Sequence, residues 1–411
     1  MGKPKIRFKG YEDDWEQRKL EEYLGVSKEK NRDESFGKDD VLSVSGEYGI
    51  VNQIEFQGRS FAGASVANYG VVEGGDVVYT KSPLKSNPYG IIKTNKGKTG
   101  IVSTLYAVYK PKNNVGAEFV QIYFELDSRM NSYMHPLVNK GAKNDMKVSD
   151  ENALKGSVIF PKIDEQKAIS KYFAQLDHLI TLHQRKCEET KSLKKYMLQK
   201  MFPENGKCVP KIRFSGFSDD WEQRKLGELG SLKNGMNFSK DAMGHGFHFV
   251  NLQNIFGNNV VNVNALGLAD ATEKQLLEYT LIEGDVLFVR SSVKLEGVGE
   301  AALVPESLEN TTYSGFIIRF RDEYGLNNDF KKYIFGTQKV RNQIMSQATN
   351  SANKNISQGV LENLTFEVPS FDEQAKIGEF FTNLDYLITL HQHKCDELQK
   401  LKKFMLQNMF V

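Results

Sequence analysis

One long segment that occurs twice sets the strongest limit on how this chain can fold. The first copy runs from Asp164 to Met201, DEQKAISKYFAQLDHLITLHQRKCEETKSLKKYMLQKM, and the second from Asp372 to Met409, DEQAKIGEFFTNLDYLITLHQHKCDELQKLKKFMLQNM. At 1.5 Å per residue each copy predicts a helix of about 55 Å, too long for one small domain to cover. We therefore expect the two helices to bury their apolar stripes against each other, as an antiparallel coiled coil.

The stripe on each copy advances in alternating steps of four and three residues, which is typical of a helix-helix seam. The predicted seam of the first copy is Ile169, Phe173, Leu176, Ile180, His183 and Cys187, continuing to Leu193, Met197 and Met201. The predicted seam of the second is Ile377, Phe381, Leu384, Ile388, His391 and Cys395, continuing to Leu398, Leu401, Met405 and Met409. No Pro or Gly interrupts the first copy, and Gly378 falls in the opening turn of the second.

A histidine and a cysteine stand four residues apart in each seam and allow two interpretations. On one helical face such a pair could bind zinc. A polar seam residue also fixes register and orientation in coiled coils, and two histidines facing each other across a pseudo-twofold axis would do so. We favour the structural role and predict no metal site. Elsewhere, His245 and His248 lie in a Gly-rich loop. Contact with a nucleic-acid base and ordinary solvation are the two interpretations of these histidines.

A second repeat shows that the whole chain is one module written twice. PKIRFKGYEDDWEQRKL from Pro4 to Leu20 returns as PKIRFSGFSDDWEQRKL from Pro210 to Leu226. The second helix ends where a third copy would begin, so we expect the N-terminal segment to pack beside it and close a cycle. The predicted segments are an N-terminal segment (1–20), globular domain 1 (21–160), a central helix (161–209), the second N-terminal-like segment (210–226), globular domain 2 (227–368) and a C-terminal helix (369–411).

The two globular domains differ in sequence but keep a common skeleton. VEGGDVVY at 72–79 matches IEGDVLF at 282–288, and each predicts a turn followed by a buried strand. TKSPLK at 80–85 and VRSSVK at 289–294 then predict matching hairpins, with further strands at 100–109 and 313–320. Short helices are expected at Ala117–Tyr133 and Asp329–Gln347. The fold class is α+β, with two globular domains separated by the helix pair.

Composition narrows the class of protein. No window approaches 18 uninterrupted apolar residues and the N-terminus lacks a secretion signal, so we expect a cytoplasmic protein without membrane contact. Three cysteines do not make a disulfide framework. The net charge of +2 is uninformative, but lysines cluster. Seven lie between Asp76 and Glu118 without an acid, and Lys331, Lys332, Lys339, Arg341 and Lys354 form a second acid-free block. A solvated face is the ordinary explanation of one such block, but two favour a polyanion partner.

Catalytic motifs fail on inspection. Gly97-Lys98-Thr99 resembles the end of a phosphate-binding loop. Such a loop also requires a glycine five residues before Gly97, and that position is Ile92. An amino-methyltransferase would need an Asn or Asp followed by Pro-Pro and an aromatic residue, and no Pro-Pro occurs. We therefore expect no catalytic residue and no cofactor in this chain.

The duplicated helix with its DEQ start, the WEQRKL segments and the two GDVLFVRSSVK-like stretches resemble the specificity subunit of bacterial type I restriction-modification systems over essentially the whole chain. The resemblance implies two target recognition domains that each read half of a split DNA sequence. It also implies docking of two modification subunits, which use S-adenosylmethionine to methylate adenine. Through them it implies two restriction subunits, which use ATP and Mg²⁺. The sequence departs from the pattern at Pro83, which stands where the second copy has Ser292.

Basic and hydroxyl side chains of the predicted hairpins are the candidate DNA contacts, because Arg and Lys bind guanine or phosphate and Ser binds either. They are Lys81, Ser82, Lys85, Arg290, Ser291, Ser292 and Lys294, with Lys143, Lys147, Asn353 and Lys354 as secondary candidates. A coiled-coil scaffold whose domains bind protein or sugar remains the alternative. Because the domains differ, a DNA target would be two unlike half-sites separated by unread base pairs, about one helical turn apart.

Overall fold

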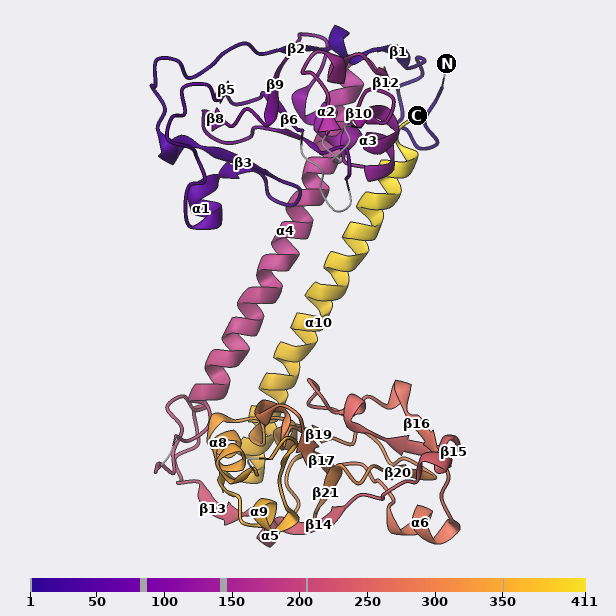
Figure 1. Ribbon diagram of the computed structural model, residues 1–411. Helices are drawn as coiled ribbons and strands as arrows, with labels where there is room; N and C mark the ends of the chain where they lie inside the picture. The colour runs from indigo at the N-terminus through magenta and orange to yellow at the C-terminus, as the bar shows by residue number, and fades with distance from the viewer. Residues whose placement is uncertain (1, 82–86, 141–145, 205, 350) are drawn as a thin grey trace. The chain divides into compact units, whose positions relative to one another are not determined.

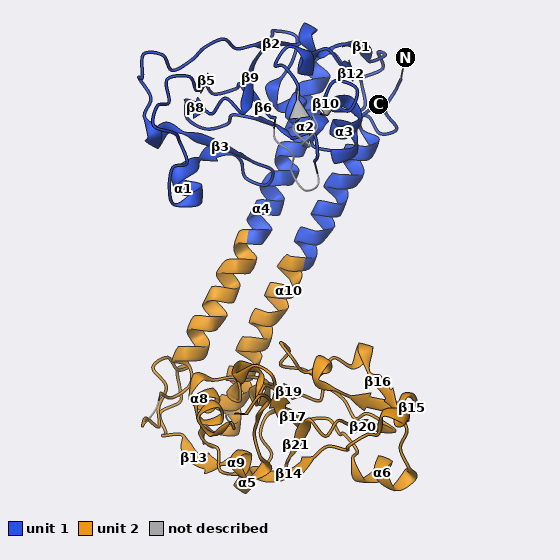
Figure 2. Cartoon of the chain, viewed as in Figure 1, with its two compact units in different colours: residues 1–184, 393–411 blue, residues 185–392 orange. Residues whose placement is uncertain are grey.

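The structure is a computed structural model that describes residues 2–81, 87–140, 146–204, 206–349 and 351–411. The chain divides into two compact units (Figure 2). Unit 1 comprises residues 1–184 and 393–411, and unit 2 comprises residues 185–392. Each unit combines helices and sheets, so the expected mixture of helix and strand is confirmed.

Two long helices, α4 (Ile163–Lys200) and α10 (Phe371–Asn408), start and end one residue before the predicted bounds (Figure 1). Each unit contains the first part of one helix and the last part of the other. In unit 1, Ile169 and Phe173 of α4 share a core with Leu406 of α10. In unit 2, Ile377 and Phe381 of α10 share a core with Met201, which directly follows α4. The helix segments therefore pack against each other inside each unit.

The helix segments of unit 2 run antiparallel. Cys187 Sγ lies 3.9 Å from the carbonyl oxygen of Ile388, and Lys194 Nζ lies 2.5 Å from Asp385 Oδ1. Residue numbers thus rise along α4 as they fall along α10. In unit 1 the equivalent lysine, Lys402, lies 2.7 Å from Asp177 Oδ1.

The predicted seam is right except at one position of each helix, Leu193 in α4 and Leu401 in α10. All the predicted positions from Ile169 to Cys187 and from Ile377 to Cys395 are buried, except that Ile388, His183 and His391 are half-buried. Leu193 and Leu401, however, are 45% and 40% exposed. Lys194 and Lys402 turn inward in their place, because an aspartate on the facing helix neutralises each ammonium group. A step of seven residues from Cys187 reaches Lys194. Because a lysine is charged and a seam is ordinarily apolar, the prediction placed the neighbouring Leu193 in the seam.

The repeated DEQ residues tie each helix start to a PKIRF segment. Arg7 binds Glu165 through Nε–Oε1 at 2.7 Å and Nη2–Oε2 at 2.8 Å, and Arg213 binds Glu373 with the same two distances. Both glutamates are buried, and a bidentate arginine is the partner that such a carboxylate requires. The same ion pair therefore joins a PKIRF segment to the start of a long helix in both copies of the repeat.

The glutamine of each DEQ triplet connects the long helix to the globular part of its unit. Gln166 Oε1 accepts from the backbone N–H of Gly116 at 3.0 Å, just before α2 (Ala117–Phe124). Gln374 Oε1 accepts from the backbone N–H of Asn327 at 3.0 Å, just before α7 (Asn328–Ile334). Both glutamines are buried, and each orients its globular part against the first turn of a long helix.

The N-terminal segment lies beside the end of α10 in unit 1, as Figure 1 shows. The backbone N–H of Ile6 donates to the carbonyl oxygen of Asn408 at 2.9 Å. In unit 2 the equivalent bond joins Ile212 and Lys200, also at 2.9 Å. The same backbone hydrogen bond thus joins a PKIRF segment to the end of a long helix in both units.

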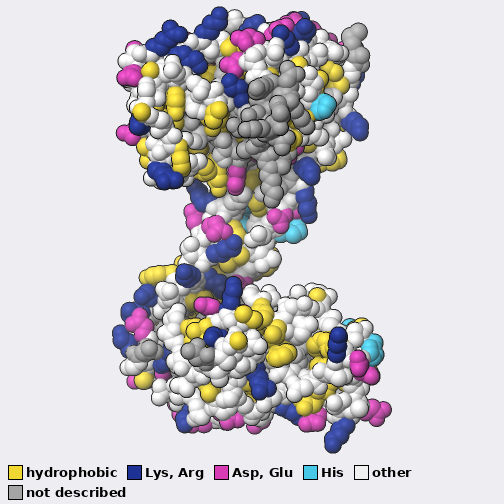
Figure 3. Space-filling view, in the orientation of Figure 1, with side chains coloured by type: hydrophobic (Ala, Val, Ile, Leu, Met, Phe, Trp, Pro, Cys, Tyr) yellow, Lys and Arg dark blue, Asp and Glu magenta, His cyan; other side chains and the backbone are white. Residues whose placement is uncertain are grey.

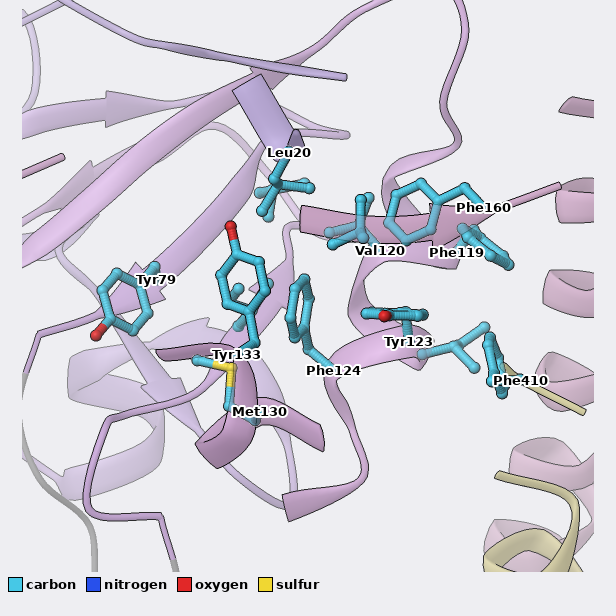
Figure 4. Packing of buried hydrophobic residues seen from close by; sticks show 14 of the residues in the cluster. Leu20, Tyr79, Phe119, Val120, Tyr123, Phe124, Met130, Tyr133, Phe160 and Phe410 are labelled. Atoms are coloured by element: carbon cyan, nitrogen blue, oxygen red, sulfur yellow. The ribbon is translucent and has the colours of Figure 1, made fainter. Parts of the chain in front are cut away.

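Aromatic residues fill the core at both places. Phe410 packs in unit 1 against Trp15, with ring centroids 6.1 Å apart. It also packs against Phe119 and Tyr123, with ring centroids 5.8 Å apart (Figure 4). Phe202, its equivalent in unit 2, packs against Trp221 and two further rings. A C-terminal phenylalanine is therefore an internal part of unit 1.

Corresponding four-stranded sheets form the centres of the two units. In unit 1 the strand order is β2-β9-β6-β7, and in unit 2 it is β14-β21-β17-β19. The first sheet consists of β2 (Leu24–Val26), β6 (Val77–Thr80), β7 (Ile92–Thr94) and β9 (Tyr106–Pro111). The second consists of β14 (Gly230–Asn234), β17 (Val286–Val289), β19 (Ala301–Leu303) and β21 (Ile317–Asp322). All strand pairs in both sheets are antiparallel.

A two-stranded ribbon beside each sheet pairs the WEQRKL segment with the strand before a long helix. These pairs are β1 (Glu16–Lys19) with β12 (Ser157–Phe160) and β13 (Glu222–Lys225) with β23 (Thr365–Val368). The predicted helical stretches each contain a break, giving α2 and α3 (Asp127–Met134) in unit 1, and α7 and α8 (Gln338–Gln347) in unit 2.

Among the described residues, the remaining elements differ between the units. Unit 1 adds β3 (Leu42–Ser45), β4 (Gly49–Asn52), α1 (Gln53–Gln57), β5 (Gly70–Val72), β8 (Gly100–Val102), β10 (Asn139–Lys140) and β11 (Met146–Lys147). Unit 2 adds α5 (Leu226–Leu229), β15 (Met243–Val250), β16 (Gly267–Ala269), α6 (Glu273–Glu278), β18 (Ser291–Ser292), β20 (Thr311–Tyr313), β22 (Lys354–Asn355) and α9 (Gln358–Glu362). The surfaces around the shared sheets are therefore built from different parts.

The aspartate of each Gly-Asp motif explains why the motif survives in both copies. Asp285 accepts from the backbone N–H of Ile282 at 2.9 Å and binds Arg321 at 2.7 Å. Asp76 accepts from the backbone N–H of Glu73 at 2.8 Å and binds Lys110 at 3.2 Å. Each carboxylate closes the turn before the central strand and pairs with a cation from the neighbouring strand. The predicted turn-then-strand is confirmed in both units.

Candidate nucleic-acid interface

The candidate contacts of unit 2 converge where the central strand leaves the sheet. β17 is buried along its whole length, and after Arg290 the chain enters β18. β18 pairs antiparallel with β22, which places Ser291 opposite Asn355 and Ser292 opposite Lys354. The predicted hairpin is confirmed, because β17 pairs antiparallel with β19 and VRSSVK leads into the connection between them. The pairing of β18 with β22 was not predicted, because β22 comes from about sixty residues further along the chain. This pairing brings the primary and secondary candidates of unit 2 together.

Arg290 is held firmly at the base of this site. Its backbone N–H donates to the carbonyl oxygen of Phe316 at 2.8 Å, and its carbonyl oxygen accepts from Ile356 at 3.0 Å. Its guanidinium Nη1 donates to the carbonyl oxygen of Gly315 at 3.3 Å, and the side chain is half-buried. Arg290 therefore braces the turn that carries Phe316, which limits how far it can reach outward.

The loop after β18 is fixed by short-range contacts. Ser292 Oγ accepts from the backbone N–H of Lys294 at 3.2 Å. A Cβ atom at Gly297 would lie 2.5 Å from Ser292 Oγ, so only glycine leaves room for this hydroxyl group. Arg341 of α8 donates to the carbonyl oxygen of Glu296 at 2.6 Å, and burial lowers the pKa of its guanidinium group. Lys294 itself is exposed at the edge of this ordered loop.

A cavity of about 540 Å³ opens beside the β18–β22 pair. Four of the predicted contacts line it, namely Ser291, Ser292, Lys294 and Asn353. Its other walls are Leu252, Phe256, Val293, Glu296, Gly297, Glu300 and Phe316. We call this group of eleven residues the β18 pocket. The apolar walls were missed from the sequence, because an apolar residue in a short strand-like stretch ordinarily predicts burial.

The candidates of unit 1 are less completely placed. Ser82, Lys85 and Lys143 lie outside the described residues. Lys147 belongs to β11, which pairs with β10. Lys81 Nζ donates to Asp150 Oδ1 at 2.9 Å, and both side chains are half-buried, so Lys81 already has a partner. As in unit 2, the segment after the central strand thus meets the segment just before the end of the globular part.

The first lysine block is not the acid-free surface that the sequence predicts. Lys96 pairs with Glu118, Lys110 pairs with Glu29, Glu73 and Asp76, and Lys112 donates to the carbonyl oxygen of Glu21. Lys93 is buried, and that burial lowers the pKa of its ammonium group. Burial opposes the charge of Lys110 too, but the hydrogen bonds that Lys110 donates to Glu73 and Asp76 raise its pKa above the usual range.

The second block is also used internally. Lys331 is buried against Asp322 at 3.2 Å, Lys332 binds Asp329 at 2.6 Å, and Lys339 binds Glu367. Lys354 Nζ donates to the carbonyl oxygen of Ser351 at 2.8 Å. The fold thus brings acids and carbonyl groups from other segments to these cations, which removes the support that the two blocks gave to a polyanion partner. Lys354 as a DNA contact stays a prediction.

The remaining sequence candidates lie elsewhere. His245 and His248 are exposed on β15, outside the β18 pocket. Within the described residues no group of three His, Cys, Asp or Glu side chains is arranged to hold a metal ion. No helix among the described residues has the length and apolar character needed to cross a bilayer.

Comparison with known proteins identifies the class. Residues 218–400 match the family model described as the type I restriction modification DNA specificity domain. The MjaVIII specificity subunit of Methanocaldococcus jannaschii is 20% identical over 313 residues, which cover 75% of this chain and 72% of that protein. The EcoKI specificity subunit of Escherichia coli K12 is 26% identical over 151 residues, covering 36% of this chain and 32% of the relative.

Solved structures show the same fold over the full chain. The S subunit of a type I restriction-modification system from M. genitalium matches with a TM-score of 0.58 at 12% identity, covering 100% of this chain and 99% of that one. The HsdS subunit from Thermoanaerobacter tengcongensis matches with a TM-score of 0.51 at 16% identity, covering 97% of each chain. Two α+β units built on paired helix segments are thus a fold that this chain shares with these solved structures. Residues 218–400 thus match the DNA specificity domain of type I restriction-modification systems, and the whole chain is similar to specificity subunits of such systems.

Proposed function

We propose that this chain selects the DNA sequence on which a type I restriction-modification complex acts, and that each unit reads one half of a split, asymmetric target. One observation carries the proposal. The two units keep one strand order around a shared sheet while differing in the elements that surround it. A shared frame with unlike surfaces suits two readers of unlike half-sites. The long helices act as a pseudo-twofold antiparallel coiled coil that sets the spacing of the half-sites.

Repeat-equivalent apolar residues on the helix segments support docking of two modification subunits. In unit 1, Leu179, Leu401 and Phe404 are 40%, 40% and 51% exposed. In unit 2, the equivalent residues Leu387, Leu193 and Tyr196 are 39%, 45% and 51% exposed. We call these two sets the helix patches. Exposed apolar groups on otherwise charged helices mark interaction sites, and two equivalent patches suit two copies of one partner.

Chemistry in this proposal belongs to the partners. The modification subunits methylate adenine with S-adenosylmethionine, and restriction subunits, bound through them, use ATP and Mg²⁺. This chain supplies sequence discrimination and no catalytic group. The assembled complex works in the cytoplasm on double-stranded DNA.

Replacing Lys294 by Ala tests the reading role of unit 2. Lys294 is exposed at the β18 pocket, so its loss should leave the fold intact. We expect a good base contact to contribute about 1–3 kcal/mol, so discrimination at one position of one half-site should fall by that amount. The measurement is competition binding by the complex with modification subunits, using duplexes substituted at each target position.

Lys274→Ala is the matched control, since Lys274 is an exposed lysine of the same unit on α6, outside the pocket. It should leave discrimination unchanged. If Lys294→Ala weakened binding equally for every duplex sequence, Lys294 would be a phosphate contact and its assignment to base reading would be wrong.

A further inference from the structure

The β18 pocket exposes apolar side chains among its polar ones. Val293 is 77% exposed, Phe316 is 58% exposed and Phe256 is 37% exposed, and all three line the cavity. Figure 3 shows hydrophobic side chains interspersed with basic ones on the visible face of unit 2. Exposing apolar groups to water is unfavourable. A partner that covers them with an apolar group of its own would therefore bind more tightly than a partner without such a group.

The apolar walls are held in place by the backbone. Phe316 sits on the turn that Arg290 braces through the carbonyl oxygen of Gly315. Val293 lies between Ser292 and Lys294, whose hydroxyl and N–H groups are bonded to each other at 3.2 Å. These residues therefore stand ready in one geometry, which reduces the ordering cost of binding.

Duplex DNA offers few groups that match this wall. The major groove displays hydrogen-bond donors and acceptors from every base, but only thymine adds an apolar group, its C5 methyl. Thymine also presents the O4 acceptor next to that methyl, and a serine hydroxyl can donate to it. Ser291 and Ser292 line the same cavity as Val293, and the ammonium group of Lys294 suits a flanking phosphate or base.

We infer that the β18 pocket reads a thymine of the half-site recognised by unit 2, with Val293 and Phe316 against the C5 methyl. The inference rests on the proposed function, because it needs the chain to read duplex DNA. It goes further by naming the base and the group on that base that is recognised. Burial of one methyl group is worth about a three- to fivefold difference in affinity.

The test replaces thymines by deoxyuridine, which lacks only the C5 methyl. The complex of this chain with its modification subunits is purified without S-adenosylmethionine, and its target duplex carries one thymine→uracil change at a time on either strand. One position should lower affinity about three- to fivefold. In a Val293→Ala complex the same change should have no further effect. Leu277→Ala is the control, because Leu277 is an apolar residue of unit 2 that is 78% exposed. Its complex should keep full sensitivity to the methyl group.

Three results would overturn the inference. The first is a complex that selects its target although the target contains no thymine, or although no thymine→uracil change has an effect that Val293→Ala removes. The proposed function then stands without this inference. The second is a Val293→Ala complex that binds all sequences more weakly, as an apolar wedge between base steps would. The third is a complex that selects no sequence, in which case the proposed function fails as well.

Discussion

Replacing Phe410 by alanine is expected to destabilise unit 1 by about 3–5 kcal/mol, although the residue is next to last in the chain. Its ring is 5% exposed and packs against Trp15 and Phe173. It also packs against Phe119 and Tyr123 (Figure 4). Arg129 also lies 4.6 Å from its ring centroid. Removing the ring leaves a cavity that these rigid neighbours refill poorly. A chain end ordinarily tolerates such changes, so the size of the effect distinguishes this fold from a frayed terminus.

The chain contains two tryptophans, Trp15 in unit 1 and Trp221 in unit 2, which allows each unit to be followed separately. In a Trp221→Phe background, denaturant unfolding monitored by Trp15 fluorescence should shift strongly on Phe410→Ala. In a Trp15→Phe background the Trp221 signal should shift much less. Phe61→Ala is the control, because Phe61 is 56% exposed in unit 1. An unchanged Trp15 transition would contradict the closure of unit 1 by the C-terminus.

Charged substitutions in the helix patches are expected to abolish assembly with the modification subunits while leaving the chain folded. Leu401→Glu with Phe404→Glu alters unit 1, and Leu193→Glu with Tyr196→Glu alters unit 2. Burying an unpaired carboxylate in a subunit interface costs several kcal/mol, so each patch should bind its partner at least about 100-fold more weakly. The same residues are exposed in the isolated chain, where the changes should cost little stability.

Subunit stoichiometry measured by native mass spectrometry separates the arms of this experiment. The unaltered chain should bind two modification subunits, a chain altered in one patch should bind one, and a chain altered in both should bind none and give no methyl transfer. Thr181→Glu, at an exposed position of α4 outside the patches, should still bind two. Full assembly by the doubly altered chain, or methyl transfer by the chain alone, would refute the docking proposal.

The parts of this fold that were predictable are those in which one chemical pattern decides one element. The bounds of α4 and α10 followed from an uninterrupted apolar period, and the Gly-Asp turns followed from turn chemistry. Leu193 shows the limit of that approach. The choice between Leu193 and Lys194 depended on Asp385 of the other helix, and such a partner has no signature in the local sequence.

The candidate site shows the same limit at longer range. VRSSVK was recognisable as special, but its strand partner, β22, lies far along the chain, so the pocket and its apolar walls were not predictable. Acid-free stretches of sequence suggested a basic surface, whereas Lys81 meets Asp150 and Lys110 meets Glu29. Charge along a sequence describes a surface only where the fold adds no partner. Support for DNA as ligand therefore comes from the similarity to specificity subunits, and no longer from the lysine blocks.

Mapping of methylated adenines tests the central claim most directly. Genomic DNA from cells that carry this chain and its modification subunits is compared with DNA from the same cells lacking only this chain. The proposal predicts methylation at one motif made of two different short half-sites, separated by a fixed run of unspecified base pairs and lost when the chain is absent. A contiguous motif, or a motif that persists without the chain, would contradict the claim that its two units read a split target.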